Sequence, residues 1–199
     1  MIWWLEFRRV LFRSCEYLPI YFIKQNFGEN YVAYYGFCLL LIGKPIGIIS
    51  YSFSQIFYKR FTENKVVGSY IIKIFGISFA LAFIIITFFA IFKNNLSSTF
   101  NNWVNSFTIF IPVLIMFLFR FISSCLSSSI YVAGKQKSFF LNELLKLLIL
   151  FFPLYIFSGN ITFVNLVNIY CATSCFVFTL RTFYYLKLIN DKRLLFIRN

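Results

Sequence analysis

The sequence has no histidine, and only six of its 199 residues are acidic. The lack of histidine excludes imidazole acid–base catalysis and removes the commonest ligand of metal sites. Charged residues of both signs make up 13% of the chain, about half of the share found in soluble domains. So few charges cannot cover the surface of a water-soluble domain, whereas a bilayer is a solvent for apolar faces. The composition therefore predicts a membrane protein.

The residues that are abundant are apolar or basic. Hydrophobic residues form 60% of the chain, and 19 Lys and Arg give a net charge of +13. The basic residues lie mostly between apolar runs, so they indicate membrane topology and contacts with lipid phosphates rather than nucleic acid. Cys171 and Cys175 share a helix face but have no histidine or acidic partners for a metal. We expect no metal, no cofactor and no nucleic-acid partner.

Five stretches are long and apolar enough to cross a bilayer as helices. No strand-like alternation competes with them, and a helix pairs its own backbone groups within lipid. The sequence thus predicts an all-α, multi-pass transmembrane helix bundle over residues 33–186 and a cytoplasmic tail over 187–199. The predicted spans are Ala33–Tyr58, Tyr70–Phe92, Asn105–Gly134, Ser138–Ser158 and Ile161–Leu186.

Basic residues alternate between the connectors of these spans. Nine follow the first, third and fifth spans, against two before the first span and after the second. Because basic connectors stay in the cytoplasm, the alternation predicts a cytoplasmic C-terminus. The nine are Lys59, Arg60, Lys65, Lys135, Lys137, Lys187, Lys192, Arg193 and Arg198.

The first 32 residues do not complete a further span. Tyr17–Phe27 has the composition of the last turns of a helix but is too short to cross a bilayer, so we interpret residues 15–32 as the end of a truncated helix and an external loop. Ile2–Ser14, IWWLEFRRVLFRS, resembles the translated adapter sequence found at the ends of metagenomic reading frames. We interpret residues 1–14 as a non-native leader and expect the natural chain to begin near Cys15, with its upstream part missing. An interfacial anchor is the alternative.

Two motifs resemble those of a known family. The stretch Phe27–Phe61, FGENYVAYYGFCLLLIGKPIGIISYSFSQIFYKRF, resembles a helix of polysaccharide flippases, with its Phe-Gly, Tyr-Tyr, central Pro and Ser-x-x-Gln ending before a basic residue. These flippases are the O-antigen and capsule members of the multidrug/oligosaccharidyl-lipid/polysaccharide exporter superfamily. Arg120–Lys137, RFISSCLSSSIYVAGKQK, resembles the small-residue helix of that family with its Gly-x-Gln-Lys turn. The resemblance covers about Tyr17–Leu186.

The resemblance implies the C-terminal half of a two-lobe, MATE-like transporter fold, with the missing N-terminal lobe as its partner. It implies translocation of an undecaprenyl-pyrophosphate-linked oligosaccharide across the bacterial inner membrane by alternating access, for surface polysaccharides such as the O-antigen of lipopolysaccharide. Such transport involves no covalent chemistry. Alternatives within the superfamily are a lipid II flippase and a multidrug or cation antiporter. A membrane-embedded glycan polymerase or acyltransferase is less favoured, because the predicted external loops are short and lack His and acidic residues.

Two basic residues are predicted to lie deep in the membrane. Lys44 is eleven residues into its span, or roughly 16 Å, and Arg120 is near the middle of another. A charge at that depth is costly unless it faces a cavity or a partner. On the functional interpretation, both line a cavity and bind the substrate pyrophosphate. On the structural one, they pair with helix carbonyls or with a carboxylate of the missing lobe.

The other charges within the spans have weaker interpretations. Glu143 and Lys146 are spaced i,i+3, so they either neutralise each other or form a proton- or ion-coupling element. Lys73 and Arg181 lie near predicted cytoplasmic ends, where long side chains extend to the interface.

Small residues and proline mark two further places. Gly43, Pro45 and Gly47 predict a bend that serves either as a hinge or as a site of close helix packing. A serine run could line a wet cavity with hydroxyls or permit tight packing; its members are Ser123, Ser124, Ser127, Ser128 and Ser129.

Overall fold

The structure is a computed structural model that describes residues 17–63, 68–99, 104–157, 159 and 161–197. Over these residues the chain is helical apart from short turns, and no strand occurs among them. The all-α prediction is therefore confirmed. The predicted leader and Cys15 lie outside the described residues.

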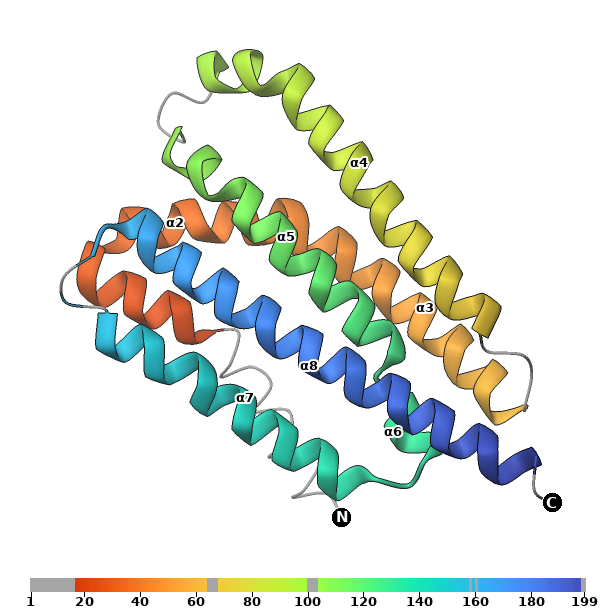
Figure 1. Ribbon diagram of the computed structural model, residues 1–199. Coiled ribbons are helices and arrows are strands. Elements are labelled where there is room, and N and C mark those ends of the chain that lie inside the picture. The colour runs from red at the N-terminus through yellow and green to blue at the C-terminus, as the bar shows by residue number, and fades with distance from the viewer. Residues whose placement is uncertain (1–16, 64–67, 100–103, 158, 160, 198–199) are drawn as a thin grey trace.

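The helices follow one another as a series of long antiparallel crossings (Figure 1). A helix over residues 17–27 comes first, and Gly28 ends it with a φ of 90°, a conformation that favours glycine. The remaining elements are α2 (Glu29–Cys38), a π-helical segment (Leu39–Gly43), α3 (Lys44–Thr62), α4 (Gly68–Thr99), α5 (Val104–Leu126), α6 (Ser129–Val132), α7 (Gln136–Phe157) and α8 (Phe163–Ile197).

Within the residues that the structure describes, five helical segments are long and apolar enough to cross a membrane, as predicted. Each overlaps one of the predicted spans. They cover Glu29–Thr62, Ser69–Thr87, Ser106–Val132, Lys137–Phe157 and Phe163–Asn190.

Large apolar side chains cover the outside of the bundle. On α4, Ile72, Phe79 and Phe83 are 74%, 74% and 71% exposed. A water-soluble protein rarely exposes so much continuous apolar surface, whereas lipid tails solvate it. Length, composition and surface thus agree on a membrane protein.

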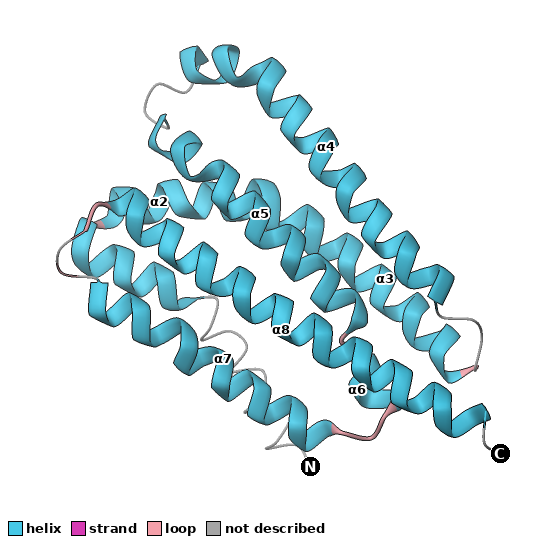
Figure 2. Cartoon of the chain, in the orientation of Figure 1, coloured by secondary structure: helices cyan, strands magenta, loops and turns pink. Residues whose placement is uncertain are grey.

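Helix α5 is the centre of the bundle. It packs against α2, α3, α4 and α8, while α7 packs mainly against α8 (Figure 2). Ile109, Val113, Phe121 and Cys125 of α5 are completely buried. They are four or eight positions apart, so they lie on one face of the helix. Phe121 of this buried face also lines the large cavity described below, together with Arg120 of the same helix.

The helix from Glu29 to Thr62 changes direction near its middle (Figure 1). The π-helical segment ends at Gly43, two residues before Pro45. Proline has no N–H to donate to the preceding turn and its ring crowds that turn, which a wider π-turn relieves. The predicted irregularity at Pro45 is present, while a role as a hinge stays a prediction.

The basic connectors gather at one end of the bundle. The end of α3, the connection from α6 to α7 and the end of α8 all lie there (Figure 1). The start of α2, the end of α4 and the start of α8 lie at the opposite end. The connectors that follow the first, third and fifth predicted spans thus lie at the same end of the bundle, as the alternation of basic residues requires.

Candidate functional site

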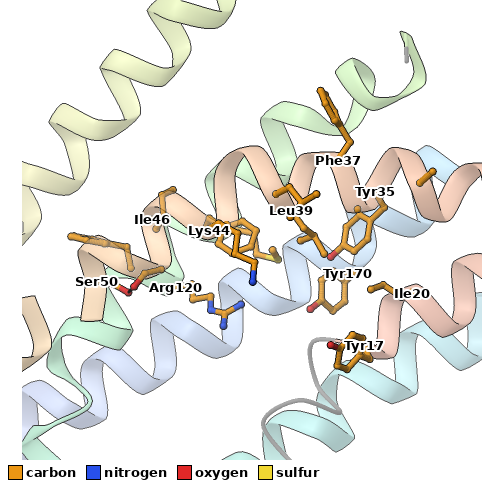
Figure 3. A pocket seen from close by; sticks show the side chains of 18 residues that line it. Tyr17, Ile20, Tyr35, Phe37, Leu39, Lys44, Ile46, Ser50, Arg120 and Tyr170 are labelled. Carbon is orange, nitrogen blue, oxygen red and sulfur yellow. Dashed lines mark hydrogen bonds between the residues drawn. The ribbon is translucent and has the colours of Figure 1, made fainter. Parts of the chain in front are cut away.

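A cavity of about 600 Å³ lies beside the π-helical segment, between that helix, α5 and α8. Lys44 and Arg120 both line it, and their nitrogen ends extend into the same space (Figure 3). Lys44 is exposed and Arg120 is half-buried. No carboxylate is among the residues described as lining this cavity. The two basic residues singled out by their depth are thus brought together, although they are 76 positions apart in sequence.

Tyrosines form another part of the same wall. Tyr35 and Tyr170 are both buried, with their rings edge to face at 6.5 Å between centroids. Tyr17 lines the cavity from the first helix. Aromatic faces suit the apolar faces of sugars, and phenol hydroxyls can hydrogen-bond their polar edges. The cavity combines this surface with two cations that suit an anionic group.

The glycines keep the wall of this cavity thin. A Cβ on Gly43 would come within 2.6 Å of the Phe117 ring on α5, so the backbone of the π-segment packs directly against that ring. Gly47 lines the cavity and has open space where its Cβ would be. Gly43 therefore supports the close-packing interpretation, and Gly47 leaves room for a ligand.

A second, smaller cavity of about 70 Å³ lies between α5, α7 and α8. Arg120 lines this cavity as well as the large one. The remaining lining residues are Ser123, Ser124, Ser127, Phe139, Glu143, Lys146, Phe178 and Arg181.

Glu143 is at the centre of a buried ion cluster beside the small cavity. Its side chain is 1% exposed, and its Oε1 atom lies 2.6 Å from Nη2 of Arg181. Its Oε2 atom lies 3.6 Å from Nζ of Lys146, which is one turn away on α7. The i,i+3 neutralisation is therefore present, and the structure adds Arg181 from α8 as the closer partner.

The expectation that Arg181 extends to the interface is wrong. Its side chain is only 10% exposed, and besides Glu143 it donates from Nε and Nη2 to the hydroxyl of Tyr185 at 3.1 and 2.8 Å. The reason is that α8 continues to Ile197, which places Arg181 well inside the helix. Lys73, by contrast, is exposed on α4.

The serine run divides between the two uses proposed for it. Ser123, Ser124 and Ser127 line the small cavity. Ser128 and Ser129 are buried beyond the end of α5, and the Ser128 hydroxyl donates to the carbonyl of Ser54 on α3 at 3.3 Å. The first part of the run thus borders a cavity, and the second part permits close helix packing.

Metal ligands do not converge in the part of the chain that the structure describes. No group of three or more cysteine, aspartate or glutamate side chains is positioned there to hold a metal ion. The described cysteines are free thiols, and Cys38, Cys125 and Cys171 are buried.

Comparison with known proteins adds no relative. Neither a family model, nor a curated protein, nor a solved structure matches this chain.

Proposed function

We propose that this chain is the C-terminal lobe of a flippase that translocates an undecaprenyl-pyrophosphate-linked oligosaccharide across the bacterial inner membrane, with its C-terminus in the cytoplasm. The observation that carries the proposal is the pairing of Lys44 with Arg120 on one cavity of about 600 Å³. Binding the pyrophosphate requires cations at membrane depth, and two cations without a neighbouring carboxylate in the lining supply them.

The dimensions of the cavity support a head-group site. Ligand sites typically occupy about 300–1,000 Å³, so the space suits a pyrophosphate with one or two sugars rather than a complete polyprenyl chain. In this proposal the lipid tail stays in the bilayer beside the exposed apolar helices. The tyrosines hold the first sugars while Lys44 and Arg120 hold the phosphates.

Transport by this lobe needs a second lobe, because alternating access requires two packings of the lobes with different substrate contacts. Arrival of the anionic head group would favour the packing that brings both lobes onto it. No step of this process breaks or forms a covalent bond, so the proposal does not include an enzymatic activity.

The antiporter alternative is disfavoured by the surroundings of Glu143. A cation-coupled antiporter needs a carboxylate that a cation can approach. Both oxygens of Glu143 already face the cationic groups of Arg181 and Lys146. Lipid II carries the same pyrophosphate group, so the two cations would bind it by the same contacts.

Binding to the chain in nanodiscs tests the proposal. With undecaprenyl-pyrophosphate-linked oligosaccharide as ligand, Arg120→Gln and Lys44→Gln should each weaken the affinity about tenfold or more, because each removes charge-assisted hydrogen bonds. Arg60→Gln is the matched control, since Arg60 is outside the cavity lining and stacks over Tyr70 at 5.2 Å.

Undecaprenol, which has the same tail without phosphate, is the ligand control. Its binding should be weak and the same for all variants. Unchanged affinity for the pyrophosphate lipid in both cavity variants would contradict the proposal. The genomic sequence upstream of Cys15 gives an independent test: a continuous frame encoding about six further helices supports it, and a soluble domain there opposes it.

A further inference from the structure

We propose that Gly36 is a specificity-determining residue of the large cavity, because its missing side chain leaves the space into which the first sugar of the lipid-linked oligosaccharide fits. Gly36 lies on α2 and lines this cavity. The inference rests on the proposed function, in which Lys44 helps to hold the pyrophosphate. It adds which end of the cavity receives the sugar and which residue limits the size of that sugar.

The fold itself does not require a glycine at position 36. Gly36 lies inside a helix, and a Cβ built on it meets no atom within 4 Å. Gly28 and Gly43 differ from it, because Gly28 has a φ of 90° and a Cβ on Gly43 would overlap the Phe117 ring. Alanine is the more stable residue inside a helix. An open glycine on a cavity wall instead fits the close approach of a ligand to the backbone.

Gly36 lies on the side of the cavity where the tyrosines are. It comes eight residues before Lys44, which is about 12 Å along a helix. Tyr17, Tyr35 and Tyr170 also lie toward the start of α2, away from Lys44 (Figure 3). Aromatic faces suit the apolar faces of sugars. With the phosphates at Lys44, the first sugar therefore lies between the backbone at Gly36 and these tyrosines.

Gly47 lies on the other side of Lys44 and provides a contrast. It comes three residues after Lys44, which places the two on neighbouring turns of one helix face. Gly47 also lines the cavity and has open space at its Cβ position. A large side chain at Gly47 would crowd the phosphates, which every pyrophosphate lipid carries. A large side chain at Gly36 would crowd only a lipid that carries a sugar.

The test compares two ligands on the complete chain in nanodiscs. They are undecaprenyl pyrophosphate without a sugar and the same lipid carrying one N-acetylglucosamine, and the quantity measured is the ratio of the second affinity to the first. Gly36→Leu should lower this ratio about tenfold or more, because the new side chain occupies the space of the sugar. Gly36→Ala adds one methyl group and should lower the ratio about threefold.

Two matched variants locate the effect. Gly47→Leu should weaken the binding of both lipids alike and leave the ratio unchanged. Gly76 of α4 also has open space at its Cβ position but does not line the cavity, so Gly76→Leu should keep both affinities. The proposal is overturned if the ratio falls in Gly47→Leu or Gly76→Leu as far as in Gly36→Leu, because the space at Gly36 is then not the space of the sugar.

Failure of this inference is distinguishable from failure of the proposed function. If the unmodified protein binds neither pyrophosphate lipid more tightly than undecaprenol, the proposed function fails and the inference fails with it. If the unmodified protein binds both lipids and Gly36→Leu keeps the ratio, only the inference is overturned. Gly36→Ala gives the same decision if Gly36→Leu does not fold, since alanine is the residue that a helix accommodates best.

Discussion

The large cavity beside α3 and the small cavity between α5, α7 and α8 share Arg120, but they accommodate their basic side chains in different ways. Lys44 is exposed in a cavity of about 600 Å³ without a carboxylate in its lining. Lys146 and Arg181 are buried beside about 70 Å³ of space and pair with Glu143. A cation within a bilayer thus needs either open space for solvent and ligand or an acidic partner, and this chain uses both solutions.

The largest expected effect is a difference in stability between variants of the two cavities. Glu143→Gln should lower the free energy of unfolding by about 3–5 kcal/mol, because Arg181 stays buried without its counter-charge. Lys44→Gln should change it by no more than about 0.5 kcal/mol, since an exposed side chain has little to lose. Unfolding of each purified variant with increasing SDS in mixed micelles measures both. Equal losses would contradict the difference between the cavities.

A double variant sharpens the same comparison. Combining Glu143→Gln with Arg181→Gln should cost about 1–3 kcal/mol less than the sum of the two single losses, because the second change removes the charge that the first left unpaired. The same cycle with Lys44→Gln in place of Arg181→Gln serves as the control and should be additive. SDS unfolding of the four proteins in each cycle gives the coupling energies.

Two glycines in the wall of the large cavity should differ in how much an alanine changes the stability. Gly43→Ala should destabilise the protein by about 1–3 kcal/mol, because the new methyl group would overlap the Phe117 ring. Gly47→Ala meets no atom within 4 Å and should be neutral or gain up to about 1 kcal/mol from the helix preference of alanine. Thermal unfolding of the pair compares them directly, and an equal loss would argue against close packing at Gly43.

The smallest effect belongs to a neutral hydrogen bond beside the ion cluster. The Tyr184 and Ser138 hydroxyls lie 2.7 Å apart and join α8 to α7. Tyr184→Phe should cost about 1 kcal/mol, whereas Tyr51→Phe changes a tyrosine that is 67% exposed and should cost less. The midpoint temperatures of the two variants measure the difference. If Tyr184→Phe proves no worse than Tyr51→Phe, the hydrogen bond adds nothing to the packing of α7 against α8.

The positions of the helices and the two basic residues of the large cavity could be predicted from the sequence, because each depends only on nearby residues in the chain. Apolar runs of sufficient length define a span without reference to the rest of the fold. Depth within such a run identifies Lys44 and Arg120 as residues that need a cavity or a partner. That both face one cavity depends on the packing of α5 against the π-segment, which no single helix determines.

Arg181 shows what local reasoning missed. Its short distance from Leu186, the predicted end of its span, predicts an interfacial residue, whereas α8 continues to Ile197. The sequence nevertheless contains a sign of this ion pair, which is the similar depth of Glu143 and Arg181 on two successive helices. Glu143 lies sixteen residues before Gly159 and Arg181 lies twenty-two residues after it, which places them about 9 Å apart in depth on antiparallel helices. That difference is within reach of an arginine side chain.

The ion cluster has a consequence for how the protein is made. Helix α7 is synthesised before α8, so Glu143 leaves the ribosome 38 residues ahead of Arg181, an interval of roughly 2–8 seconds at ordinary rates of translation. An acidic residue near the centre of an inserting helix costs about 3 kcal/mol, and Lys146 is the partner that travels with it on the same helix. The order of synthesis therefore divides the neutralisation of one carboxylate between Lys146, which accompanies its insertion, and Arg181, which arrives to complete the folded bundle.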